Sequence, residues 1–322
     1  MNIYLAFLAL AVALVLLFKA GGWFVSGAVG LSLRLRLPKM LVGIVIVAFS
    51  TTLPELFVSV QAAWRGFPEI ALGNAIGSVI ADDALALALA AVIVPMLVHQ
   101  GTFRTAAPFL IIIDFMAFGL AADGTLNRWE GGALVLVLLA YILYALRQAA
   151  RGRILLPSEV AQAEQEHTPW QRVLLHFGAG LAGVLLCSQL IVESSLTIAH
   201  FYGISEFVIG LTIVAVGTSL PEIACVIAAA RRRETEVAVG NIIGADILNV
   251  LWIAGMSALV NPITVSQQII YFSFPAMIVV VLTMLLFLRT GWRMTRREGL
   301  FLLGMYGVYL WLLASWFGQP AG

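Results

Sequence analysis

Long apolar segments separated by short polar ones recur along the whole chain. We count ten segments that are long enough to cross a membrane, which takes about 20 residues per helix. They do not alternate apolar and polar positions as barrel strands do, so we expect helices. The expected spans are 3–31, 40–64, 69–97, 106–123, 129–147, 172–199, 206–230, 235–259, 267–288 and 298–317. The pattern predicts an all-α polytopic membrane protein, with the first span too long for a cleaved signal peptide.

One internal repeat relates the two halves of the chain. Residues 43–82 align without a gap with residues 210–249. The aligned identities are Gly43 with Gly210, Thr51 with Thr218, Pro54 with Pro221, Glu55 with Glu222, Glu69 with Glu236, Gly73 with Gly240, Asn74 with Asn241 and Gly77 with Gly244. The second copy begins an odd number of spans after the first, so the copies are inverted in the membrane. Inverted repeats of interrupted helices are typical of secondary transporters.

The repeat predicts the division of the chain. We expect a first five-helix repeat over 1–147, a hydrophilic linker over 148–171 and a second, inverted five-helix repeat over 172–322. Composition agrees with a membrane protein, since 61% of the residues are apolar and 11% are charged. The two cysteines, Cys187 and Cys225, fall within predicted spans, where we expect core packing rather than a disulfide or a metal site.

Basic residues divide the predicted loops into two sets. One set holds Arg34, Arg36, Lys39, Arg104, Arg147, Arg151, Arg153, Arg172, Arg231, Arg232, Arg233, Arg289, Arg293, Arg296 and Arg297. The other set holds Arg65 and Arg128. By the positive-inside rule the first set is cytoplasmic. We therefore expect an integral protein of the cell membrane with both termini outside and the 148–171 linker in the cytoplasm.

Two carboxylates at equivalent positions carry the candidate chemistry. Glu55 and Glu222 fall within predicted spans, where a carboxylate costs at least about 2.5 kcal/mol. Each follows a proline, which removes a backbone donor and is expected to free carbonyl oxygens one turn earlier, around Ala48 and Ala215. Nearby polar side chains add oxygens: Thr51, Thr52, Thr218, Ser219, Asn74, Ser78, Asp82, Asn241 and Asn249. Such oxygens suit a hard cation such as calcium, and the absence of a His or Cys set argues against zinc or copper.

Other intramembrane acids allow more than one interpretation. Asp83 and Asp246 are not equivalent in the repeat, and each is as consistent with helix packing or a rim position as with the site. Asp114 and Glu193 lie in other spans, where structural hydrogen bonding or a place on an ion pathway is favoured over direct binding.

With both motifs in view, the chain resembles the calcium/cation antiporter superfamily and its prokaryotic sodium/calcium exchanger branch. The resemblance rests on STTLPE with GNAIGS and on GTSLPE with GNIIGA, and it covers almost the whole chain. It implies the sodium/calcium exchanger fold, with broken helices 2, 3, 7 and 8 as a core across which helices 1 and 6 slide. It also implies calcium binding by Glu55 and Glu222 with the carbonyls of Thr51 and Thr218. The positions that match sodium ligands are Ala48, Thr51, Thr52, Ser78, Ala215, Thr218 and Ser219.

Three departures from that branch leave the driving ion open. Ala245 stands where a serine is usual, Asp82 and Asn249 are exchanged relative to the usual order, and Val79 and Asp246 replace asparagines. We expect sodium influx to drive calcium efflux by alternating access. The alternative is proton-coupled exchange of calcium or another divalent cation, because like charges favour protonation of one of a group of acids.

Other functional classes fit less well. The four histidines form no HExxH pair and the aspartates lack a GxGD context, which argues against an intramembrane protease. A channel would use similar oxygens but would show no counterflow. We therefore expect a transporter rather than an enzyme, with no cofactor, no nucleic acid and no obligatory protein partner. Its partners are the transported ions (calcium, with sodium or protons) and the lipid bilayer.

Overall fold

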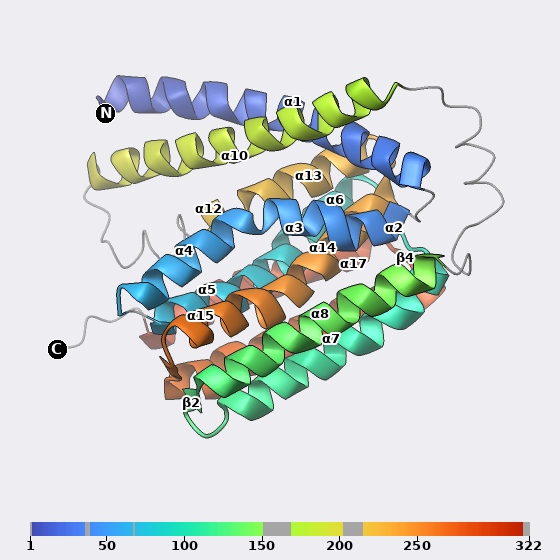
Figure 1. The fold of residues 1–322 in the computed structure, drawn as a ribbon. Coiled ribbons are helices and arrows are strands. Elements are labelled where there is room, and N and C mark those ends of the chain that lie inside the picture. Colours follow the sequence, from blue (N-terminus) through green and yellow to red (C-terminus); the bar gives the residue numbers. More distant parts are fainter. Residues whose placement is uncertain (1, 36–38, 67, 151–168, 202–214, 318–322) are drawn as a thin grey trace.

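The computed structural model describes residues 2–35, 39–66, 68–150, 169–201 and 215–317. Figure 1 shows a helical bundle in which two long helices, α1 (Ile3–Leu35) and α10 (Trp170–Phe201), lie together along one side. The remaining helices form the larger part of the bundle. The all-α class predicted from the apolar segments is confirmed, since the only strands among the described residues are short pairs between loops.

The repeated segments form interrupted helices in the middle of the bundle. The first segment consists of α2 (Lys39–Val42), η1 (Gly43–Val47), α3 (Ala48–Thr51) and α4 (Leu53–Trp64), followed by α5 (Pro68–Ala81), η2 (Asp82–Leu87) and α6 (Ala88–Ile93). The second consists of α12 (Ala215–Thr218) and α13 (Leu220–Arg231), followed by α14 (Thr235–Leu248), η4 (Asn249–Ile253) and α15 (Ala254–Val260). The segments η1, η2 and η4 are π-helical turns, which often occur at functional sites.

Four further helical segments and two strand pairs complete the bundle. The helices are α7 (Gln100–Ala121), α8 (Arg128–Ala150), α16 (Phe274–Arg289), which η5 (Ile269–Ser273) precedes, and α17 (Arg296–Phe317). A 3₁₀ turn, η6 (Thr290–Trp292), follows α16. Strand β1 (Met96–Leu97) pairs antiparallel with β4 (Arg293–Met294), and β2 (Thr125–Leu126) pairs antiparallel with β3 (Ile263–Thr264). These pairs join loops of the first half to loops of the second half.

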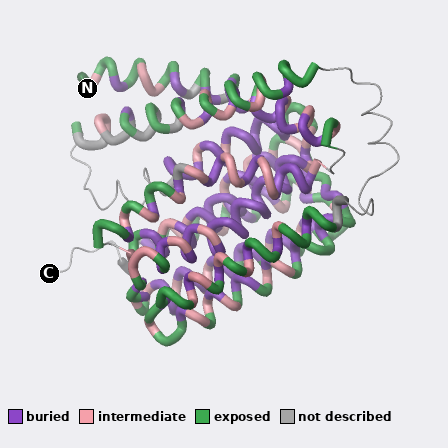
Figure 2. The backbone as a smooth tube through the Cα atoms, in the orientation of Figure 1, coloured by how far each residue is buried: buried purple, intermediate pink, exposed green. Residues whose placement is uncertain are grey.

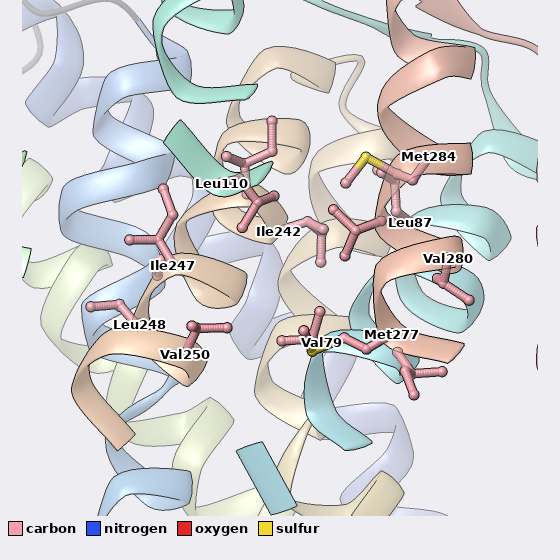
Figure 3. Packing of buried hydrophobic residues seen from close by; sticks show 14 of the residues in the cluster. Val79, Leu87, Leu110, Ile242, Ile247, Leu248, Val250, Met277, Val280 and Met284 are labelled. Carbon is pink, nitrogen blue, oxygen red and sulfur yellow. The ribbon is translucent and has the colours of Figure 1, made fainter. Parts of the chain in front are cut away.

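Burial separates central helices from peripheral ones. In an 18-residue apolar window within Thr235–Val260, 94% of the residues are buried inside the bundle, whereas only 17% of the window Trp170–Cys187 is buried. Figure 2 shows the same contrast, with buried residues in the middle of the bundle and mostly exposed or intermediate ones along α1 and α10. The apolar side chains around the central helices pack closely, as Figure 3 shows for Val79, Ile242, Leu110 and Met284. The exposed apolar surface of the outer helices suits contact with lipid.

The described helices account for eight of the ten predicted membrane spans. Seven are long and apolar enough to cross a membrane, or eight if the bent pair Lys39–Thr51 and Glu55–Trp64 counts as one span. That pair bends by 48°. The tenth predicted span corresponds to α17, which is a helix of the expected length but is not among these candidate spans. The first part of the span predicted over 206–230 lies outside the described residues.

The described loops of the two predicted sets lie at opposite ends of the bundle, one with β4 and the other with β2 (Figure 1). At one end Lys39 Nζ pairs with Glu234 Oε2 at 2.8 Å, and the guanidinium groups of Arg104 and Arg289 lie 5.4 and 4.4 Å from the centre of the Trp292 ring. At the other end Arg128 Nη2 donates to the Val260 carbonyl at 3.3 Å. The described basic residues are therefore concentrated at the end that holds β1 and β4.

Candidate cation site

Two helix breaks place the paired glutamates at the centre of the fold. Helix α3 ends at Thr51 and α4 begins at Leu53, while α12 ends at Thr218 and α13 begins at Leu220. Proline is the second residue of both α4 and α13, where its missing N–H is tolerated. Glu55 and Glu222 consequently lie in the first turn of a helix, where the macrodipole favours a negative charge. Both glutamates are fully buried.

Each glutamate accepts a hydrogen bond from the opposite repeat. Thr52 Oγ1 donates to Glu222 Oε1 at 3.1 Å, and Ser219 Oγ donates to Glu55 Oε1 at 3.0 Å. Thr52 and Ser219 are equivalent in the repeat, as are Glu55 and Glu222. The two hydroxyl–carboxyl contacts are therefore related by the same two-fold symmetry as the sequence copies, and they cross between the halves.

A second crossed pair lies next to the first. Thr51 Oγ1 lies 3.3 Å from Asn241 Oδ1, and Thr218 Oγ1 lies 3.3 Å from Asn74 Oδ1. Gly240, next to Asn241, makes this approach possible, because a Cβ there would overlap the backbone of Met40 in α2. Gly244 of α14 likewise lies against the backbone of Ile44, whereas nothing lies within 4 Å of a Cβ built at the equivalent Gly73 or Gly77 of α5.

The symmetry fails at two positions. Ser78 Oγ donates to Glu55 Oε1 at 3.2 Å, but its equivalent is Ala245, which brings no hydroxyl to Glu222. Asp82 and its equivalent Asn249 are both fully buried and differ in charge. The first repeat therefore supplies more polar groups to the site than the second.

Several oxygens at this centre have no hydrogen-bond partner. They are Glu55 Oε2, Glu222 Oε2, both carboxyl oxygens of Asp82 and the amide oxygen of Asn249. The carboxyl groups of Glu55, Glu222 and Asp82 interact electrostatically with one another. Among the described residues no basic side chain forms an ion pair with Glu55, Glu222 or Asp82, so these acids are not compensated. Buried anions without compensation are costly, which makes the centre suited to a cation or to protons.

The backbone oxygens do not follow the sequence expectation in one respect. The Ala48 carbonyl accepts a hydrogen bond from Thr52 N at 2.9 Å and lies 3.2 Å from Thr51 Oγ1. Because a helical N–H bonds the carbonyl four residues earlier, Pro54 deprives Ser50 rather than Ala48 of a partner. The prediction that the proline frees the Ala48 carbonyl is therefore wrong. Ala215 opens α12 directly after residues 202–214, which lie outside the described part of the chain.

The remaining intramembrane acids fall into two groups. Asp83, Asp114 and Asp246 are buried near one another, which their spacing along the chain does not predict. Glu193 is on the exposed side of α10, where it accepts a hydrogen bond from Gln189 Nε2 at 3.0 Å. Glu193 is therefore not part of the central cluster. Cys187 and Cys225 are free and buried.

Acidic side chains alone do not form a closed ligand shell. Among the described residues no three Asp, Glu, His or Cys side chains are placed to hold a metal ion by themselves. A cation at the centre would therefore also need hydroxyl, amide or carbonyl oxygens, as hard cations commonly use in proteins. Thr52, Ser78 and Ser219 bring hydroxyls into contact with the two glutamates.

Comparison with known proteins gives consistent matches over nearly the whole chain. The family described as sodium/calcium exchanger protein matches residues 5–147 and 172–314. The inner membrane protein YrbG of Escherichia coli is 30% identical, covering 98% of each chain. The sodium/calcium exchanger MaX1 of Methanosarcina acetivorans is 28% identical, covering 95% of this chain and 98% of its own. A structure of the sodium-calcium exchanger NCX_Mj soaked with Na⁺ and Sr²⁺ superposes with a TM-score of 0.84 at 26% identity, covering 98% and 99% of the two chains.

Proposed function

Because this chain belongs to the sodium/calcium exchanger protein family, we propose that it is a secondary antiporter that exchanges sodium for calcium across the membrane. The ions compete for one central site built on Glu55 and Glu222. Calcium binds the carboxyl oxygens of the two glutamates, and the hydroxyls of Thr52, Ser78 and Ser219 hold the carboxyls in place. Asp82 and Asn249 supply further oxygens from the next helix of each repeat.

One observation carries this proposal. Glu55 and Glu222 each accept a hydrogen bond through Oε1 from the opposite repeat, while Oε2 of each has no partner. The bonded oxygen fixes the carboxyl group and the other oxygen is available to a cation. Two such carboxylates can compensate a divalent charge, which an alcohol or amide cannot do.

The remaining proposed ligands contribute neutral oxygens. They are the hydroxyl or carbonyl groups of Thr51 and Thr218, and the carbonyls of Ala48 and Ala215. The Thr51 and Thr218 hydroxyls already lie beside the asparagines of the opposite repeat. The Ala48 carbonyl accepts a hydrogen bond from Thr52 N, and its second lone pair becomes available to an ion when the Thr51 hydroxyl turns to the Val47 carbonyl or to Asn241. Such neutral oxygens suit sodium, which brings only one charge.

Alternating access follows from the charge of the centre. An empty site carries uncompensated carboxylates, which are costly to carry through the membrane interior, whereas an occupied site is neutralised. Ions that compete for the same carboxylates therefore move in turn, and a ligand shifts the equilibrium by its differential affinity for the two states. In our proposal α1 and α10 slide over the core, which they contact where Gly21 meets the Ala224 carbonyl.

We also propose the orientation and division of the molecule. The end that holds β1 and β4 faces the cytoplasm because basic residues are concentrated there. Both termini then face outward and the 148–171 linker is cytoplasmic, in the cell membrane. Residues 1–147 and 172–322 are the two inverted halves that exchange contacts at the centre.

A second candidate is exchange of calcium, or another divalent cation, for protons. The favouring observation is Ala245, which removes a hydroxyl from the Glu222 side and with it a neutral oxygen for sodium. Asp82 adds a third carboxyl group at the centre, and it is fully buried. A proton can neutralise such a group without requiring a ligand shell.

Calcium-45 uptake into proteoliposomes separates the two candidates. One set of vesicles is loaded with sodium and diluted into sodium-free medium at equal pH, and the other carries only a pH gradient with an acidic interior. We expect uptake from the sodium gradient alone. Collapse of each gradient by a sodium or a proton ionophore is the matched control. Uptake driven only by the pH gradient would replace our proposal by proton coupling, and uptake from neither gradient would contradict calcium antiport.

A further inference from the structure

A second group of buried acids lies beside the central site. Asp83 is in η2, Asp246 is in α14, and Asp114 is in α7, outside the interrupted helices. Asp83 and Asp246 are fully buried, and Asp114 is 1% exposed. Three separate elements therefore direct carboxyl groups into the apolar interior within one region.

The repeat does not account for these acids. By the alignment that relates Glu55 to Glu222, Asp83 corresponds to Val250 and Asp246 corresponds to Val79. Asp83 and Asp246 thus come from non-equivalent positions of the two halves. The central glutamates are equivalent residues of the two repeats, but Asp83 and Asp246 are not. The symmetric cation site therefore does not explain why these two acids are present.

The carboxyl groups are close together and have no partner other than one another. The elements η2 and α7 both pack against α14. The carboxyl groups of Asp83 and Asp246 lie within hydrogen-bonding reach of each other, and Asp114 interacts electrostatically with both. No hydroxyl, amide or basic group donates a hydrogen bond to either carboxyl oxygen of Asp83 or Asp246, or to Oδ1 of Asp114. No basic side chain among the described residues forms an ion pair with Asp83, Asp114 or Asp246. Packing alone would favour apolar residues here, because unpaired buried carboxyls destabilise the fold.

From this arrangement we infer that Asp83 and Asp246 bind a second hard cation next to the central site. No three acids converge on one point in the described structure, so Asp114 acts from α7 through its charge or through a bridging water. Carboxylate oxygens make calcium the matching class of ligand. Asp82 interacts with both Glu222 and Asp246, so the two sites adjoin.

Equilibrium binding tests this inference without requiring transport. The full chain is purified in detergent, and bound calcium-45 is counted per chain by equilibrium dialysis at increasing CaCl₂. We expect the wild type to bind two calcium ions. D246N should bind one, and addition of E222Q to D246N should remove that ion. D123N, which changes an acid in an exposed loop, is the matched control and should bind two.

The outcomes separate this inference from the proposed function. E222Q alone should retain one calcium ion, bound at the Asp83–Asp246 pair, although its transport is lost. If the wild type binds a single ion that E222Q removes, or if D246N still binds two, the second site does not exist. Thermal unfolding identifies a variant that does not fold. In that case D114N replaces D246N and should weaken only one of the two binding steps, by about tenfold, whereas two unchanged steps would overturn the inference.

Discussion

The central glutamates are each held by a hydroxyl from the other half of the chain. Thr52 donates to Glu222, and Ser219 donates to Glu55. A hydrogen bond to a charged group contributes about 1.5–3 kcal/mol. A change at either hydroxyl should therefore act on the glutamate across the repeat and not on the one three residues later in its own helix.

A double-mutant cycle tests this crossing. T52A combined with E222D should be non-additive in calcium affinity, with a coupling of about 1 kcal/mol, because both changes remove the same contact. T52A combined with E55D should be close to additive. Calcium affinity is measured by calorimetry on the purified chain. If T52A were coupled to E55D but not to E222D, the Thr52 hydroxyl would act on Glu55 of its own repeat, which would contradict the crossed contact.

The missing hydroxyl at Ala245 is a second residue-scale prediction. Ser78 donates to Glu55, whereas the fully buried Ala245 leaves Glu222 without the equivalent donor. A245S should restore this donor and lower the sodium concentration for half-maximal calcium uptake about fivefold, which corresponds to about 1 kcal/mol. G73A, at an exposed position of α5, is the control and should leave the sodium dependence unchanged. A sodium dependence that A245S does not alter would remove Ala245 from the account of coupling.

The sequence identified which residue types gather at the centre, but not how they pair. The repeat and the prolines predicted that Glu55 and Glu222 occupy equivalent helix breaks, and both do lie there. The crossed contacts depend on how two inverted copies interlock, which spacing within one copy does not determine. The same reason explains Asp83 and Asp246, whose meeting requires η2 and α14 to be placed against each other.

At the scale of elements, close backbone contact joins the two outer helices. A Cβ at Gly180 of α10 would overlap the backbone of Phe24 in α1, and a Cβ at Gly27 of α1 would overlap the backbone of Phe177 in α10. The Phe24 and Phe177 rings pack 4.8 Å apart between these positions. Small residues permit this approach where lipid provides no hydrophobic drive for association. In α1, Gly27 thus permits the close contact with α10, and Gly21 permits the contact with the core at Ala224.

Two glycines in α10 provide a matched test of this packing. G180A should lower the free energy of unfolding by about 2 kcal/mol, since backbone atoms of α1 would have to move. G178A should be neutral or slightly stabilising, because open space surrounds Gly178 and alanine favours helix more than glycine does. Thermal unfolding in detergent measures both variants. Equal stability of G180A and G178A would contradict the close contact.

The interruptions of the central helices were only partly predictable. Proline marks the breaks at Thr52 and Ser219, because it cannot continue the backbone hydrogen bonding. The π-helical turns Gly43–Val47 and Asn249–Ile253 contain no proline, and apolar periodicity does not distinguish them from α-helix. Tertiary packing decides those turns, so they become visible only in the structure.

At the scale of the molecule, the basic end defines the orientation. Labelling from one side of the membrane tests it, in a background where Cys187 and Cys225 are replaced by alanine. D123C, in the loop before β2, should react with a membrane-impermeant maleimide in intact cells. R293C in β4 should react only after the cells are permeabilised, because we place β4 in the cytoplasm. The reverse pattern would invert the proposed topology.

The central claim is that calcium crosses the membrane on the paired glutamates. The most direct measurement is calcium-45 uptake into sodium-loaded proteoliposomes by E222Q, compared with E69Q, which changes an exposed glutamate in the first turn of α5. E222Q keeps the shape of the side chain but removes the charge that the cation requires. We predict that E222Q lowers the initial rate at least about tenfold, which corresponds to about 1.4 kcal/mol, and that E69Q equals the wild type. Wild-type uptake by a folded E222Q would contradict the account.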